Sequence, residues 1–155
     1  MTTIPELAPE GELDHVKIGD FATEAGASIA DVTIAYRRWG AFAGDPHGAN
    51  NIVVIEHALT GDSNAADWWG DLIGPGKALD TQQWCVIVTN ALGSCKGSTG
   101  PCSPHLDGKA WGSRFPALSI RDLVEAEHKF LQELGFEHVH AVIGGSMGGA
   151  QIGRA

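Results

Sequence analysis

The chain has 155 residues, of which 43% are hydrophobic and 19% charged, and its formal net charge is −9. This composition is typical of a globular domain with a sizeable core, and the acidic balance argues against a nucleic-acid partner, which requires a basic face. No apolar run is long enough for a membrane span, and residues 1–19 lack the apolar stretch of a signal peptide, so we expect no membrane association and a cytoplasmic location.

Strand-like and helix-like stretches alternate along the chain, which is typical of the α/β class. We expect residues 1–31 to be a poorly defined to strand-forming N-terminal segment. The alternation in residues 32–36 predicts an early strand. The continuous apolar run in residues 52–55 predicts a buried parallel strand. Residues 62–81, rich in Gly, Asp and Trp, indicate a long loop with at most a short helix.

The second half of the chain contains the clearest helix. A second buried strand is predicted over residues 84–89, and a long loop rich in Gly, Ser and Pro follows over residues 90–118; such loops are often functional. Ser119 is the expected N-cap of the helix, and Asp122 in its first turn favours the helix dipole. Gly135 is expected to end the helix. One face is apolar and is formed by Ile120, Leu123, Val124, Leu131 and Leu134, with Phe130 beside it.

A glycine-rich hexapeptide, Gly-Gly-Ser-Met-Gly-Gly, occupies residues 144–149 directly after the apolar stretch 139–143. A strand that ends in Gly-x-Ser-x-Gly is the nucleophile elbow of an α/β-hydrolase fold. The serine stands at the tip of a sharp turn, and a side chain at Gly144 or Gly148 would collide with neighbouring backbone. The pattern predicts a mostly parallel sheet flanked by helices, with Ser146 as nucleophile. The alternative is a tight glycine turn with an inert serine.

A nucleophilic serine that attacks a carbonyl also needs two backbone N–H groups to hold the developing oxyanion. One donor is expected from Met147, the residue after the nucleophile, and the other from a loop that follows an earlier strand. Residues 57–61 follow the strand at residues 52–55, and the Leu59 N–H is the predicted second donor. The alternative is that residues 57–61 are only a turn.

The remaining members of a catalytic triad are not found after the elbow. In this fold the acid and the histidine follow the serine in the chain, and no His, Asp or Glu follows Ser146. All seven histidines, His57 included, precede it, and we do not expect any of them to be the base. The catalytic Asp and His are therefore expected to be absent from this chain, and the sheet is expected to be truncated just after the elbow.

The three cysteines form no recognisable metal pattern. Cys95, Cys102 and His105 follow the spacing C-x6-C-x2-H, which is not a standard zinc arrangement. We therefore expect structural or incidental thiols, no metal, and no permanently bound cofactor.

Several of these stretches together resemble the homoserine O-acetyltransferase family of the α/β-hydrolase superfamily. The resemblance runs from about Val32 to Ala150 and combines Leu-Gly-x-Cys-x-Gly-Ser-Thr-Gly-Pro with the Gly-Gly-Ser-Met-Gly-Gly elbow. General esterases of this fold share only the elbow. The matching stretches are residues 57–62, 68–69, 74–77, 79–81, 90, 92–93, 95–101, 107–109, 111–112, 115–116, 121–122 and 144–149.

The resemblance implies a ping-pong acetyl transfer from acetyl-CoA to the hydroxyl group of L-homoserine, a step of methionine biosynthesis. It implies that Ser146 carries the acetyl group, that Leu59 and Met147 hold the oxyanion, and that Thr60 lies beside the substrate. It also implies a homodimer, and a base histidine, an aspartate and an arginine in a part of the family missing here. Residues 32–155 are then the N-terminal portion of a single hydrolase domain after the segment 1–31.

Other functions remain open at this point. The chain could belong to a homoserine O-succinyltransferase or a serine O-acyltransferase, which differ in pocket residues mostly outside this sequence. It could also be a non-catalytic truncated remnant. As an isolated chain we expect it to be inactive or nearly so, because Ser146 has no visible base.

Overall fold

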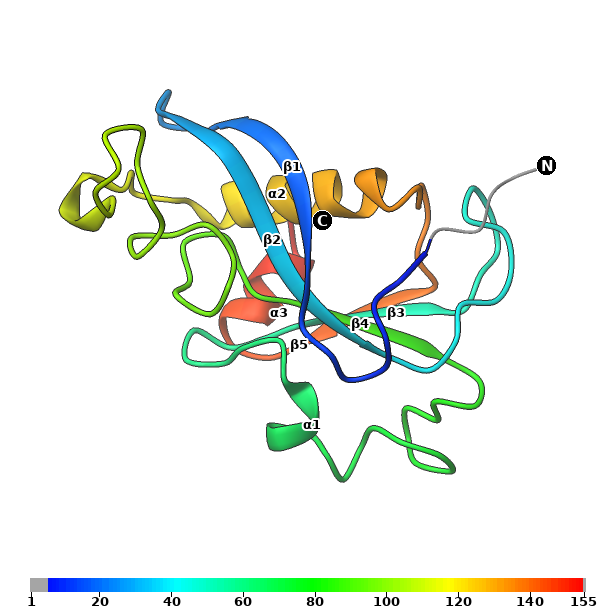
Figure 1. Ribbon diagram of the computed structural model, residues 1–155. Helices are drawn as coiled ribbons and strands as arrows, with labels where there is room; N and C mark the ends of the chain where they lie inside the picture. Colours follow the sequence, from blue (N-terminus) through cyan, green and yellow to red (C-terminus); the bar gives the residue numbers. More distant parts are fainter. Residues whose placement is uncertain (1–5, 155) are drawn as a thin grey trace.

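A computed structural model describes residues 6–154 and shows one five-stranded mixed sheet with helices on both of its faces (Figure 1). Residues 1–5 and 155, the outermost parts of the predicted segment and domain, lie outside the described residues. The elements in chain order are β1 (Asp14–Ala22), β2 (Ser28–Trp39), β3 (Ile52–Glu56), α1 (Ala65–Trp68), β4 (Cys85–Thr89), the short 3₁₀ helix η1 (Gly112–Arg114), α2 (Ile120–Glu133), β5 (Ala141–Gly144) and α3 (Met147–Ile152).

The strand order is β1-β2-β4-β3-β5. The strands β4, β3 and β5 are parallel, whereas β2 pairs antiparallel with both β1 and β4. Every residue of β3 and β4 is buried, as expected for parallel strands covered on both faces. The predicted fold class, an α/β-hydrolase fold with a mostly parallel sheet, is confirmed. The early strand is longer than the sequence pattern indicated, because β2 extends over both of its antiparallel neighbours.

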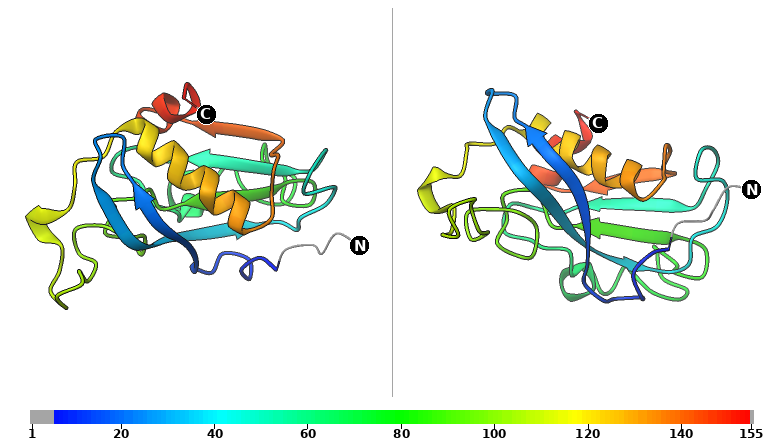
Figure 2. Two further views of the ribbon diagram at one scale, coloured as in Figure 1. Left: turned by 90° about the horizontal axis from the view of Figure 1, so that it is seen from above. Right: turned by 45° about the horizontal axis from the view of Figure 1, so that its top comes forward.

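Two apolar clusters lie on opposite faces of the sheet, and alternate residues of a strand belong to opposite clusters. Val54 and Ile87 pack with Phe130 of α2 in one cluster. Val86 packs with Ala65 of α1 in the other cluster. Figure 2 shows α2 lying along its face of the sheet, with α3 beside it. Because β3, β4 and β5 are parallel, their carboxyl ends lie at one edge of the sheet. The loops that matter for function emerge at this edge.

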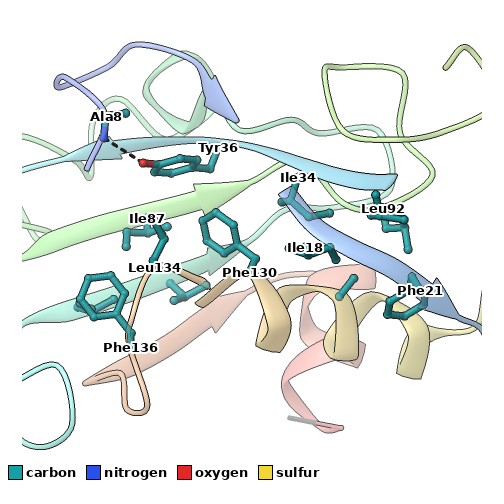
Figure 3. Packing of buried hydrophobic residues seen from close by; sticks show 14 of the residues in the cluster. Ala8, Ile18, Phe21, Ile34, Tyr36, Ile87, Leu92, Phe130, Leu134 and Phe136 are labelled. Carbon is teal, nitrogen blue, oxygen red and sulfur yellow. Dashed lines mark hydrogen bonds between the residues drawn. The ribbon is translucent and has the colours of Figure 1, made fainter. Parts of the chain in front are cut away.

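The larger cluster also fixes the strand β2 against α2 (Figure 3). The ring of Tyr36 meets Phe130 edge to face, with the two centroids 5.0 Å apart. The Tyr36 hydroxyl accepts a hydrogen bond of 2.9 Å from the backbone N–H of Ala8, so this buried polar group is satisfied. Such aromatic pairs contribute about 1 kcal/mol beyond the area they bury.

Both ends of α2 follow the prediction. Ser119 caps the helix by accepting from the Asp122 N–H, and the Asp122 carboxylate accepts from the Ser119 N–H, which completes a capping box. The other carboxylate oxygen of Asp122 accepts from the Glu24 N–H at 2.7 Å and so joins the helix to the β1–β2 hairpin. Gly135 ends the helix at a φ of 86°, in a Schellman motif closed by the Phe136 N–H.

The long loop between β4 and α2 is tied to the sheet rather than free of it. The Ser98 hydroxyl accepts from the Ala35 N–H at 2.9 Å and donates to the Asn90 carbonyl at 2.5 Å. The Thr99 hydroxyl accepts from the Thr33 N–H at 2.9 Å. These bonds hold the loop along β2. Within residues 6–154 no helix combines the length and apolarity that crossing a membrane requires.

Candidate active site

Ser146 stands between β5 and α3 in a strained backbone conformation, with φ 58° and ψ −121°. Apart from Asp31, it is the only non-glycine residue with a positive φ in the described part of the chain. Such conformations cost about 1–3 kcal/mol and persist only where the surroundings enforce them. Ser146 is exposed, so the turn presents its hydroxyl group to solvent.

The glycines of the elbow are required by close contact with β3. A Cβ atom on Gly144 would stand 2.6 Å from the carbonyl oxygen of Glu56, and one on Gly148 would overlap the same oxygen. A Cβ on Gly145 would meet nothing within 4 Å, and one on Gly149 only the Gly144 oxygen at 3.8 Å. The structure therefore agrees with the collision expected at the first two positions, and it identifies Glu56 as the residue they would hit.

The loop after β3 is held in place by the imidazole of His57. Its Nε2 accepts from the Ala91 N–H at 3.1 Å, so the ring proton must be on Nδ1, which donates to the Ala58 carbonyl at 2.7 Å. The Gly61 N–H donates to the same carbonyl at 2.8 Å and closes a turn. Because both ring nitrogens form hydrogen bonds with backbone groups, His57 has no free nitrogen with which to take a proton from Ser146.

Leu59, at the tip of this turn, and Met147, at the start of α3, line the same cavity of about 390 Å³. Residues 91–94 and the segment around Phe115 and Leu118 form its other walls. Within residues 6–154 neither the Leu59 N–H nor the Met147 N–H has a hydrogen-bond acceptor. Both N–H groups therefore lack a partner within the described residues and belong to residues that line one cavity; Ser146 directly precedes Met147 but is not one of the lining residues. Thr60 is exposed and is not one of the residues that line this cavity.

Sequence reasoning missed a buried pair of carboxyl groups behind the elbow. Glu56, at the end of β3, is hydrogen-bonded to Glu127 of α2, and Glu127 accepts from the Thr89 hydroxyl at 2.8 Å. Burial and the neighbouring Glu127 raise the pKa of Glu56 to about 10, so its carboxyl group is protonated at neutral pH. An acid that ends an otherwise apolar buried strand was the available signal, but its partner could only be found in three dimensions.

The remaining candidates form no metal centre. Among residues 6–154 no three His, Cys, Asp or Glu side chains are placed to hold a metal ion. Cys95 and Cys102 lie beside each other at the surface, whereas His105 packs edge to face against Trp111. His57 is the only histidine among the residues that line the cavity next to Ser146.

The family model for the alpha/beta hydrolase fold matches residues 51–155. The chain is 64% identical over 148 residues to a homoserine O-acetyltransferase from Corynebacterium efficiens, covering 96% of this chain and 39% of the relative. It is 50% identical to one from Mycobacterium avium, covering 96% of the chain and 41% of that relative. The chain thus spans about two fifths of the length of the curated relatives it matches. The resemblance of this chain to homoserine O-acetyltransferases is confirmed.

Solved structures give the same fold from two kinds of enzyme. A homoserine O-acetyltransferase from Bacillus anthracis superposes with a TM-score of 0.81 at 26% identity, covering 95% of this chain and 43% of its own. The esterase E22 gives a TM-score of 0.81 at 32% identity, with 90% and 42% covered. An acetylester hydrolase from Corynebacterium glutamicum gives 0.78 at 31% identity, with 91% and 39% covered.

Proposed function

Since this chain belongs to the α/β-hydrolase fold family, we propose that it contributes the nucleophile and the oxyanion hole of an acetyltransferase that acts on acetyl-CoA and L-homoserine. The observation that carries the proposal is the strained, exposed Ser146, which directly precedes Met147, a residue that lines one cavity together with Leu59. The sequence identity to homoserine O-acetyltransferases supports the choice of acyl donor and acceptor.

The proposed reaction has two halves. In the first, the Ser146 hydroxyl oxygen attacks the thioester carbonyl of acetyl-CoA, the N–H groups of Leu59 and Met147 stabilise the oxyanion, and CoA leaves as a thiol. In the second, the side-chain hydroxyl of homoserine attacks the acetyl-serine, and O-acetylhomoserine leaves. Ser146 is regenerated, so each acetyl group is bonded to the protein once on its way to the acceptor. In this account Thr60 lies beside the acceptor.

The group that takes the proton from Ser146 is proposed to come from outside these residues. His57 is occupied on both ring nitrogens, and no His, Asp or Glu follows Ser146 in the sequence. We therefore propose that residues 1–155 alone do not turn over, because a serine without its base retains only the weak contribution of the oxyanion hole and binding.

The family resemblance supports further proposals about the protein's setting. They are a cytoplasmic role in methionine biosynthesis, a homodimer, and no tightly bound cofactor. Residues 32–155 would belong to one hydrolase domain, and residues 1–31 would precede it as a segment.

A second candidate function is hydrolysis of acetyl esters, in which water replaces homoserine as the acceptor. The specific observation in its favour is that esterase E22 superposes as well as the acetyltransferase from Bacillus anthracis does. The higher sequence identity to homoserine O-acetyltransferases favours transfer over hydrolysis.

The test is a chimera in which this chain replaces the matching part of the Corynebacterium efficiens enzyme. CoA release from acetyl-CoA is measured with homoserine, with serine and with neither, and succinyl-CoA is tested as an alternative donor. We expect release that depends on homoserine and acetyl-CoA and that disappears in the Ser146→Ala chimera. Release without any acceptor would support the hydrolase, and a preference for succinyl-CoA or serine would replace the proposed substrates.

A further inference from the structure

Two exposed cysteines, Cys95 and Cys102, lie next to each other in the loop between β4 and α2. Other residues of this loop line the cavity that Leu59 and Met147 share. The Sγ atoms of the two cysteines are 2.9 Å apart, about 0.9 Å more than a disulfide bond. The loop between them is folded back on itself, because the Gly93 N–H donates to the Thr99 carbonyl at 2.8 Å. A Cβ on Gly100 would overlap the Ser94 carbonyl oxygen, so the two limbs of the loop touch at this point.

We propose that Cys95 and Cys102 are a modification site that a small-molecule disulfide, such as oxidised glutathione, converts into a reversible intramolecular disulfide. The two thiols are exposed and adjacent, and the backbone already holds the limbs that carry them side by side. Disulfides of this kind in reducing compartments are transient and report on the redox state. Nothing in the proposed acetyl transfer uses either thiol.

The chemistry is a pair of thiol–disulfide exchanges. The Cys102 thiol donates a hydrogen bond to Cys95, which raises the pKa of Cys102 and leaves Cys95 as the acceptor. The Cys95 thiolate attacks one sulfur of oxidised glutathione, and one glutathione thiolate leaves. The Cys102 thiolate then attacks the Cys95 sulfur and releases the second glutathione. The two cysteine protons end on two glutathione thiols, and one disulfide bond is broken for one formed.

The crosslink would act on the cavity through the chain on either side of it. Ser94, directly before Cys95, lines the cavity that Leu59 also lines. Cys102 stands before Ser103, whose carbonyl accepts from the Trp111 N–H at 3.0 Å, in the segment that leads to Phe115. A disulfide between Cys95 and Cys102 would therefore join the segment that ends at Ser94 to the segment that leads to Phe115, and both Ser94 and Phe115 line the cavity.

The experiment incubates the purified protein with defined ratios of oxidised to reduced glutathione, blocks free thiols by alkylation, and maps tryptic peptides by mass spectrometry. Trypsin cleaves after Lys96, between the two cysteines, so the disulfide joins two peptides and is detected directly. We expect the linked pair, with fragmentation locating the bond at Cys95. Cys85 is an internal control, because burial raises the pKa of its thiol to about 11 and shields it from exchange.

The variant Cys102→Ser separates a disulfide from separate oxidation of each thiol. Without the resolving thiol, the glutathione adduct on Cys95 should accumulate at least about tenfold over the wild type, because an adjacent thiol has a high effective concentration. The reciprocal variant Cys95→Ser provides the same comparison for the glutathione adduct on Cys102. The peptide map of the wild type tests the disulfide even if neither variant folds. Stable glutathione adducts on both cysteines, or no linked peptide at any ratio, would overturn the proposal.

Discussion

The backbone carbonyl oxygen of Glu56 occupies the place that a Cβ atom on Gly148 would need. This contact presses the first turn of α3 against the end of β3 and holds the turn in which Ser146 has a positive φ. The elbow is therefore a consequence of packing between two segments far apart in the sequence.

Replacement of Gly148 by Ala should destabilise the fold by about 1–3 kcal/mol, because the added methyl group forces backbone apart in a packed region. The matched control is Gly149→Ala, in the same helix, where the new Cβ would have only an ordinary contact at 3.8 Å. That variant should be neutral or slightly stabilising, since Ala favours helices over Gly. Urea unfolding of both proteins measures the difference, and equal effects of the two substitutions would contradict the packing described here.

Ser146→Gly should be more stable than Ser146→Ala by about 1 kcal/mol, because Gly adopts a positive φ without the steric cost that any Cβ incurs. Both variants lack the hydroxyl group and should be equally inactive. Thermal unfolding of the pair isolates the backbone strain from the chemistry. If the alanine variant were the more stable of the two, the strain assigned to the elbow would be wrong.

The variant Glu56→Gln should gain stability relative to the wild type as the pH rises. The pKa of Glu56 is raised from 4.5 to about 10 in the folded state, so the folded protein holds a proton that the unfolded chain releases. The contribution of protonated Glu56 to the free energy of unfolding is fully present below pH 4.5. It is lost as the pH rises toward 10, by at most about 1.4 kcal/mol per pH unit.

Denaturant unfolding of the wild type and the variant between pH 5 and pH 9 checks this dependence. Glu133→Gln, at an exposed position of α2, is the control and should follow the wild type. A stability difference between wild type and Glu56→Gln that stays constant with pH would show that Glu56 titrates normally.

Ser119→Ala should cost about 1 kcal/mol, since it removes the hydroxyl group that accepts from the Asp122 N–H at the start of α2. Ser113→Ala, at an exposed position of η1, is the control. Chemical denaturation of the two variants is sufficient. A loss at Ser119 no larger than that at Ser113 would show that the capping box adds nothing.

The sequence predicted those features that a short stretch of residues signals. The ends of α2 follow from Ser119 and Gly135, and the elbow follows from the order of an apolar strand, small residues and Ser146. Buried β3 and β4 follow from continuous apolar runs. In each case the signal is a pattern of residue types within a short stretch, although the packing that enforces the elbow and buries β3 and β4 involves distant segments.

Features made by distant residues could not be predicted in this way. The strand β1 pairs with β2 in a register that shifts on both sides of Gly19, and its own residues do not specify that register. The hydrogen bond from the Ala91 N–H to His57 and the contact of Glu56 with Glu127 each join segments that only the folded sheet brings together. For the same reason the sequence could name Leu59 and Met147 but could not show that they line one cavity.

We propose that Ser146 carries the acetyl group during transfer. The most direct measurement is peptide mass spectrometry of the chimera with the Corynebacterium efficiens enzyme, quenched after acetyl-CoA is added without homoserine. We expect one acetyl group on Ser146, its loss when homoserine is added, and no acetylation of residues 1–155 alone. Homoserine-dependent turnover by a chimera in which Ser146 is never acetylated would rule out Ser146 as the acetyl carrier.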